Sequence, residues 1–174
     1  AVFHISQFWD GRAKDLKEQA AGPILAAGEM GLQSEIKAVE KISAIPKYEI
    51  LFRNAFPTED QPITFDNITT SIAAFESTLI TEDKFDLWMK GQAEFTKQEL
   101  DGLQTFINTG CISCHNGPLI GGNSYQKLGL AQSWDTDPSH TDLGRFNITK
   151  LETDKQVFKV PSLRNVTATA PYFH

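Results

Sequence analysis

Apolar residues recur at helical spacing along residues 12–79. Residues 12–21 carry Leu16 and Ala20 four positions apart, which predicts a short helix that ends at the glycine-proline pair 22–23. Residues 32–44 repeat apolar positions at intervals of four and three and predict a second amphipathic helix. The apolar positions of this second helix are Leu32, Ile36, Val39 and Ile42.

Two further helices follow the same rule. One begins near Pro46, which a first helical turn tolerates, and ends before Pro57. Its expected buried residues are Tyr48, Leu51 and Phe52. The other begins after Thr64, an N-cap residue type, and carries a longer apolar stripe that we expect in the core. That stripe comprises Ile68, Ile72, Phe75 and Leu79.

The second half of the chain carries one strong helix signal. Thr96 and Glu99 form a capping box, and Gly110 is placed to end the helix that it opens. The expected buried face of this helix comprises Leu100, Leu103, Phe106 and Ile107. Residues 116–130 are rich in glycine and predict a loop suited to wrap a flat cofactor, whereas residues 157–160 fit a short strand or a loop equally well.

These patterns predict a mostly α fold with long loops. The acidic stretch at residues 81–83 suggests a boundary between two domains, 1–80 and 81–174. The chain has 174 residues, of which 40% are apolar, and a formal net charge of −6, which argues against nucleic acid as a partner. No run of about 18 apolar residues is present, so we expect no membrane span. Its first residues lack the pattern of a secretory leader, so we expect any export signal to have been removed.

The most specific motif is the pentapeptide CISCH at residues 111–115. It contains both cysteines of the chain, Cys111 and Cys114, and His115 follows the second cysteine directly. Two thiols on either side of a two-residue spacer can add to the vinyl groups of one porphyrin, and the adjacent imidazole can reach the iron. The pentapeptide therefore predicts a covalent haem c attachment site, and a periplasmic protein, because such attachment normally takes place outside the cytoplasm.

Other uses of two cysteines are weaker. A zinc site would need two more ligands from His4, His140, His174 or carboxylates, and none of these shows paired metal-ligand spacing. A thioredoxin-like redox pair usually opens a helix, whereas this motif follows one. A structural disulfide would leave the adjacent histidine without a role.

Several segments resemble the bacterial dihaem cytochrome c peroxidases in sequence and in order. They are residues 8–12 (FWDGR), 18–20 (EQA), 22–23 (GP), 29–31 (EMG), 144–146 (GRF), 158–165 (FKVPSLRN) and 170–174 (APYFH). This resemblance implies cytochrome c-like haem domains, a peroxidatic one represented by 1–80 and an electron-accepting one by 81–174. It also implies that the chain lacks the first haem motif and the segment that supplies a methionine to the second haem iron.

The resemblance implies roles for individual residues. His115 would be the proximal ligand of the electron-accepting haem. Trp9 would lie between the two haems and assist electron transfer, although a core tryptophan is the alternative from the residues alone. Gln19 and Glu29 would line the distal face of the peroxidatic haem. Glu29 is framed by Gly28 and Gly31, and a carboxylate on such a loop can approach a ligand closely, although an exposed loop acid is the more common case.

The resemblance further implies a calcium ion, bound partly by the backbone carbonyls of Thr169 and Pro171, and a homodimer. The implied reaction is reduction of hydrogen peroxide to water, with electrons from a small cytochrome c or a cupredoxin. Two alternatives stay open. One is the related dihaem oxygenase that matures a tryptophan-derived cofactor in another protein, and the other is an electron-transfer cytochrome c without catalysis.

Overall fold

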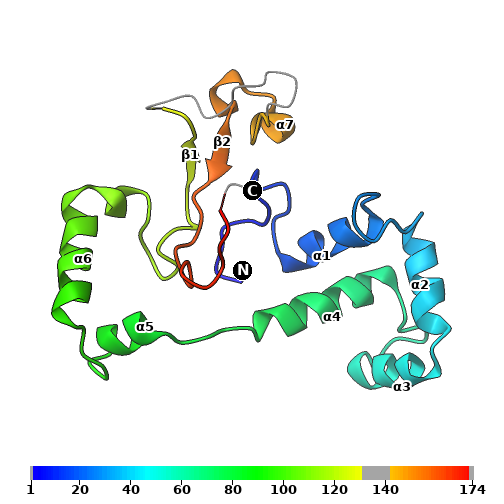
Figure 1. Cartoon of the computed structure of the whole chain (residues 1–174). Helices are drawn as coiled ribbons and strands as arrows, with labels where there is room; N and C mark the ends of the chain where they lie inside the picture. The colour runs from blue at the N-terminus through cyan, green and yellow to red at the C-terminus, as the bar shows by residue number, and fades with distance from the viewer. Residues whose placement is uncertain (1, 131–141, 173–174) are drawn as a thin grey trace. The chain divides into compact units, whose positions relative to one another are not determined.

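A computed structural model describes residues 2–130 and 142–172 of the chain. The candidate zinc ligands His140 and His174 lie outside these residues. The chain forms two compact units, drawn in Figure 1. Unit 1 comprises Ala13–Leu79 together with Val2, and unit 2 comprises Phe3–Arg12 and the described residues from Ile80 onward. The predicted division into 1–80 and 81–174 therefore differs from these units at the N-terminal segment Phe3–Arg12.

Unit 1 is built from four helices. They are α1 (Leu16–Leu25), α2 (Glu35–Ser43), α3 (Pro46–Ala55) and α4 (Phe65–Ser77). Helix α1 lies along α4, and α2 contacts both α3 and α4 (Figure 1). The four helices meet in one apolar cluster, to which each contributes a single buried residue. These residues are Ile24, Ala38, Phe52 and Ile68.

The start of each helix in unit 1 follows from its sequence. The side chains of Asp15, Ser34 and Thr64 accept a hydrogen bond from a backbone N–H of the first turn. Helix α3 has Pro46 in its first turn instead. The predicted end of α1 at Pro23 is wrong, because the helix continues to Leu25. Its last turn keeps the hydrogen bond from the N–H of Ala26 to the carbonyl of Gly22, and buries Ile24.

The apolar stripes of unit 1 are buried only in part. Ile36 on α2 and Leu51 on α3 are exposed, and Tyr48 is exposed at 37%. Phe75 on α4 and Leu79, two residues beyond its end, are 63% and 62% exposed, so the expectation that this stripe is core holds only for its first half. Within the described part of the chain, the side chains that pack against α4 gather around Ile68 and Ile72, one to two turns before Phe75. The apolar cluster therefore does not reach the end of the stripe.

Unit 2 contains fewer regular elements. Its described residues form helices α5 (Lys84–Met89), α6 (Lys97–Asn108) and α7 (Phe146–Thr149), and the single-turn 3-10 helices η1 (Cys111–Ser113) and η3 (Glu152–Asp154). Strands β1 (Tyr125–Lys127) and β2 (Val157–Lys159) pair antiparallel, with Tyr125 opposite Lys159. Part of the expected loop 116–130 is therefore a strand. None of the described helices has the length and apolar content needed to cross a membrane.

His4, in the N-terminal segment of unit 2, makes the stability of the folded chain depend on pH. Burial and the charge of Lys159 lower the pKa of His4 from 6.5 to about 4. Between these two values the unfolded chain binds more protons than the folded one, so this contribution to stability is complete above pH 6.5 and is lost as pH falls toward 4. We expect a His4→Gln variant to show a flatter decline in melting temperature between pH 6.5 and pH 4.5. Equal slopes in the variant and the wild type would contradict this.

Candidate functional site

The pentapeptide at residues 111–115 follows α6 after one tight reversal. The capping box of Thr96 and Glu99 opens α6 as predicted, with each side chain accepting from the backbone N–H of the other residue. Thr109 is the C-cap residue, and Gly110 adopts the left-handed backbone (φ +84°) that ends many helices. The capping residues thus determine both ends of α6, and the two cysteines lie in the turn that follows the helix.

That next turn is η1, and it brings the two cysteines together. The N–H groups of Cys114 and His115 both bond the carbonyl of Cys111, at 3.3 and 2.9 Å. Residues three apart in such a turn lie over one another, so both thiols project from the same side. Both cysteines are free; Cys111 is exposed and Cys114 half-buried. Two accessible thiols on one side of a turn match the geometry of a double thioether attachment.

The imidazole of His115 is half-buried and has an oriented ring. Its Nδ1 lies 3.3 Å from the carbonyl oxygen of Ile120, and its ring meets that of Phe106 edge-on at 6.5 Å. When Nδ1 carries the proton and donates to this carbonyl, Nε2 has a free lone pair. A backbone carbonyl on one ring nitrogen is the usual partner of a metal-binding histidine. His115 is therefore arranged to bind iron through Nε2.

The apolar face of α6 supplies a surface for a flat cofactor. Leu100 and Ile107 on α6 are 44% and 42% exposed, Ile112 on the following turn η1 is 44% exposed, and no residue of α6 is buried. The prediction that this face is buried is thus wrong within the described polypeptide: Leu103 and Phe106 are half-buried, and Leu100 and Ile107 are exposed. Ile107 and Ile112 are close in sequence to the two free thiols and the oriented imidazole, and they offer exposed apolar surface to a porphyrin, which is planar and largely apolar. The residues present therefore fit haem c.

The loop after the pentapeptide packs tightly because it contains glycine. A Cβ atom on Gly121 (φ +131°) would lie 2.1 Å from the carbonyl oxygen of Pro161 and 3.3 Å from Nδ1 of His115. The N–H of Gly122 bonds the carbonyl of Val160 at 2.7 Å. Only glycine allows this approach, so the loop glycines hold the backbone near His115.

Arg164 holds the same loop by hydrogen bonds, a role that the sequence analysis did not predict. Its Nε and Nη2 donate to the carbonyl of Pro118 at 2.9 and 2.7 Å. Its Nη1 and Nη2 also donate to Asp83 and Asp86, at 2.9 and 2.7 Å, and these acids cap the first turn of α5. Hydrogen bonding from the Asp83 backbone, together with Arg164, lowers the pKa of Asp86. The feature of the sequence that could have indicated this contact is the capping pattern of Asp83 and Asp86 at the start of α5.

We expect Arg164→Met to lower the free energy of unfolding by about 2 kcal/mol, because two carboxylates and a carbonyl lose a charged donor. The control is Arg53→Met, since Arg53 makes an exposed ion pair with Glu49 on α3 that should contribute less than about 0.5 kcal/mol. Denaturant unfolding of both variants measures the difference. Equal, small losses would show that the hydrogen bonds of Arg164 add little to stability.

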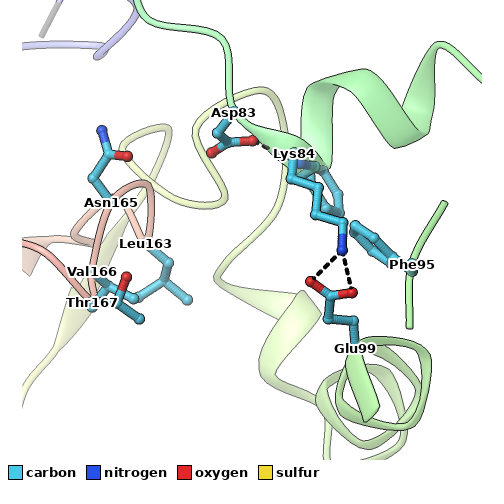
Figure 2. Close-up of a pocket in the computed structure, with 9 residues that line it drawn as sticks. Asp83, Lys84, Phe95, Glu99, Leu163, Asn165, Val166 and Thr167 are labelled. Carbon is cyan, nitrogen blue, oxygen red and sulfur yellow. Dashed lines mark hydrogen bonds and ion pairs between the residues drawn. The ribbon is translucent and has the colours of Figure 1, made fainter. Parts of the chain in front are cut away.

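A cavity of about 320 Å³ lies elsewhere in unit 2 (Figure 2). Its walls include Lys84 and Glu99, which form an ion pair at 2.6 Å, together with Leu163, Asn165, Val166 and Thr167. Hydrogen bonding from Lys84 and Thr96 lowers the pKa of Glu99 to about 2. Glu99 lies in the first turn of α6, and the pentapeptide follows its last, about 15 Å along the helix. The cavity is thus separate from the candidate haem site.

The other predicted site residues lie in different places. Trp9 belongs to unit 2 and is 63% exposed. Gln19 is half-buried within α1, and Glu29 is exposed on the turn that follows this helix, where its N–H bonds the carbonyl of Ala26. Both lie in unit 1, whereas Cys111, Cys114 and His115 lie in unit 2.

The predicted calcium ligands lie near the end of the described chain. Thr169 and Pro171 are both exposed, and the hydroxyl of Thr169 lies 3.0 Å from that of Tyr172. Among residues 2–130 and 142–172, no three His, Cys, Asp or Glu side chains are grouped as metal ligands. The family resemblance implies ligation by backbone carbonyls, which is a different kind of site.

Comparison with known proteins identifies the family. A family model described as di-haem cytochrome c peroxidase matches residues 1–94. The chain belongs to the di-haem cytochrome c peroxidase family. This confirms the resemblance seen in the sequence, and membership of a di-haem family implies haem c, for which the pentapeptide offers the attachment residues.

Individual members of the di-haem cytochrome c peroxidase family match almost the whole chain. The cytochrome c551 peroxidase of Nitrosomonas europaea is 47% identical over 98% of this chain and 50% of its own length. That of Pseudomonas aeruginosa is 48% identical over 100% of this chain and 51% of its own. The chain thus spans about half the length of these curated relatives.

A solved structure confirms the mostly α fold of cytochrome c-like haem domains with long loops. The crystal structure of a MauG-like protein associated with microbial copper homeostasis matches this chain with a TM-score of 0.83 at 27% identity. The match covers 98% of this chain and 55% of that one.

Proposed function

We propose that the protein is a periplasmic dihaem cytochrome c peroxidase that reduces hydrogen peroxide to water. The observation that carries this proposal is the turn at residues 111–115, where two free thiols and an oriented imidazole adjoin the exposed apolar face of α6. This arrangement occurs in a member of the di-haem cytochrome c peroxidase family. Covalent haem attachment outside the cytoplasm supports the periplasm as its compartment.

In this proposal Cys111 and Cys114 hold haem c through thioether bonds and His115 binds its iron. Haem supplies the redox chemistry when bound. The carbonyl of Ile120 keeps the His115 ring oriented, and the apolar face of α6 excludes water from one side of the site. Electrons from a small cytochrome c or a cupredoxin enter unit 2 at this position.

The peroxide chemistry needs two electrons and two protons for each hydrogen peroxide that becomes two waters. Glu29 serves as the acid-base group: its carboxylate takes a proton from one peroxide oxygen and gives it to the other, which then leaves as water. Its exposed place on the turn after α1 leaves the carboxylate free to meet a substrate. Gln19, on α1, orients peroxide by hydrogen bonding, and Trp9 assists electron transfer between the two haems.

The same proposal assigns the parts of the chain. Residues 1–80 contribute to the peroxidatic haem domain, and residues 81–174 form the electron-transfer domain. The backbone carbonyls of Thr169 and Pro171 contribute to a calcium site, since carbonyl oxygen suits this hard cation. The intact protein carries two haems and forms a homodimer.

Steady-state turnover tests the proposal. The intact protein, mixed with a reduced small cytochrome c and hydrogen peroxide, is expected to oxidise two donor molecules for each peroxide consumed. An absence of donor oxidation above the rate without protein would refute peroxidase activity.

The similarity to a MauG-like structure favours one second candidate, a dihaem oxygenase. The optical spectrum of the intact oxidised protein separates the two. A methionine-to-iron charge-transfer band supports the peroxidase, and tyrosine ligation in its place supports the oxygenase.

A further inference from the structure

The segment Phe3–Arg12, which carries Trp9, has no helix or strand of its own. Phe8 and Gly11 adopt left-handed backbone conformations (φ +63° and +77°), so the backbone of the segment is irregular. The hydrogen bonds between Arg12 and Asp10 lie within the segment and cannot by themselves fix its position in unit 2. Contacts with the remainder of unit 2 must do so.

Lys159, at the end of β2, makes three of these contacts. Its backbone N–H donates to the carbonyl of Trp9 at 2.7 Å. Its ammonium donates to the carbonyl of Ser6 at 2.6 Å and lies 3.1 Å from Nδ1 of His4. One residue thus binds the segment at three separate positions.

This contact needs a side chain with several hydrogen-bond donors, because it bonds both a carbonyl and an imidazole nitrogen. Lys159 is only 7% exposed, and burial lowers its pKa while the charge of Asp10 opposes this shift. His4 has its pKa lowered to about 4, so its ring is neutral at pH 7 and Nδ1 can accept. An apolar side chain in place of Lys159 would leave a buried carbonyl without its donor.

The same strand end joins the segment to the loop that orients His115. Val160, the next residue, accepts from the N–H of Gly122 at 2.7 Å, and the carbonyl of Gly122 accepts from the N–H of Ile5 at 3.1 Å. Two residues earlier in this loop, Ile120 provides the carbonyl that lies 3.3 Å from His115 Nδ1. Strand β2, the His115 loop and the Trp9 segment are therefore one hydrogen-bonded structure.

We propose that Lys159 is a positioning residue that fixes the Trp9 segment against the loop of the haem ligand His115. Its contribution to catalysis rests on the proposed role of Trp9 in electron transfer between the haems. Lys159 touches neither substrate nor reacting atoms, and it acts through the position of Trp9.

Amide hydrogen exchange on the intact holoprotein tests the contact itself. Lys159→Met keeps the length of the side chain and the backbone N–H that bonds Trp9, and removes the ammonium that bonds Ser6 and His4. We expect residues 3–12 to exchange at least about 10-fold faster while α1–α4 stay unchanged. The matched control is Lys155→Met, because Lys155 is paired with Glu152 by a solvent-accessible ion pair in the same unit. Unchanged exchange in residues 3–12 of the Lys159 variant would overturn the proposal.

A second variant covers the case in which Lys159→Met does not fold. His4→Phe removes one acceptor and leaves Lys159 in place, so we expect a smaller increase in exchange confined to the same residues. Slow exchange of the segment in this variant, equal to that of the wild type, would likewise count against the contact.

A double-mutant cycle with Trp9→Phe tests the link to catalysis. We expect Lys159→Met to slow electron transfer between the haems, measured by rapid mixing, about 10-fold in the wild type and to have little further effect in the Trp9→Phe protein. Equal losses in both backgrounds would overturn action through Trp9. Should Trp9→Phe alone leave the transfer rate unchanged while hydrogen exchange increases in the Lys159 variant, the contact stands and the proposed role of Trp9 fails.

Discussion

Replacing both cysteines of the pentapeptide, Cys111→Ser together with Cys114→Ser, is expected to abolish covalent haem attachment in unit 2. Both thiols lie on one 3-10 turn, free and accessible, and a hydroxyl cannot replace a thiol in the thioether bond. The peptide that contains residues 111–115 should carry the mass of one haem in the wild-type protein and none in the double variant. Peptide mass spectrometry after denaturation makes this measurement.

The matched control is Ser113→Ala, between the two cysteines. It removes only the hydroxyl that donates to the carbonyl of Gly110 at 2.7 Å, so the peptide should keep its haem. A wild-type peptide without haem mass would contradict the assignment of the pentapeptide. Haem that withstands denaturation on the double variant's peptide would contradict it equally.

Glu29→Gln in the intact protein is expected to lower peroxide turnover by about 10²-fold or more, the usual contribution of a general acid-base group. Glutamine is nearly the same size as glutamate but cannot take and release a proton at neutral pH. Because Glu29 is exposed on a turn, the replacement should leave folding and both haem spectra unchanged. Steady-state oxidation of a reduced cytochrome c by peroxide measures the loss.

Glu35→Gln is the control for this change. Glu35 is an exposed acid in the first turn of α2, in the same unit as Glu29, and its replacement should leave turnover within about twofold of the wild type. Full activity in Glu29→Gln would remove Glu29 from the acid-base role. A similar loss in both variants would point to a general effect of charge.

The sequence predicted the helices well where capping and spacing are local. Thr64 and the pair Thr96 and Glu99 act as caps, as expected, because a cap depends on residues within one turn. Burial was harder to predict. Phe75 on α4 continues the periodic stripe of Ile68, but the buried cluster of unit 1 does not extend to it. Periodicity shows which face of a helix is apolar, and not what covers that face.

The residues of the candidate site also differ in whether local sequence could predict them. Cys111, Cys114 and His115 are neighbours in sequence, so their spacing alone predicted their chemistry. Lys159 and Arg164 could not be found in this way, because their partners His4 and Asp83 lie 155 and 81 positions away. Hydrogen bonds between such distant residues depend on the complete fold.

The central proposal is that the haem bound by His115 supplies an electron for the reduction of peroxide. Rapid mixing of the fully reduced intact protein with one equivalent of hydrogen peroxide tests it directly. The absorption band of the His115 haem is assigned by difference from the double cysteine variant. We expect this band to change from the reduced to the oxidised form within a single turnover, as the His115 haem gives up its electron. Consumption of the peroxide while the His115 haem stays reduced would contradict the proposal.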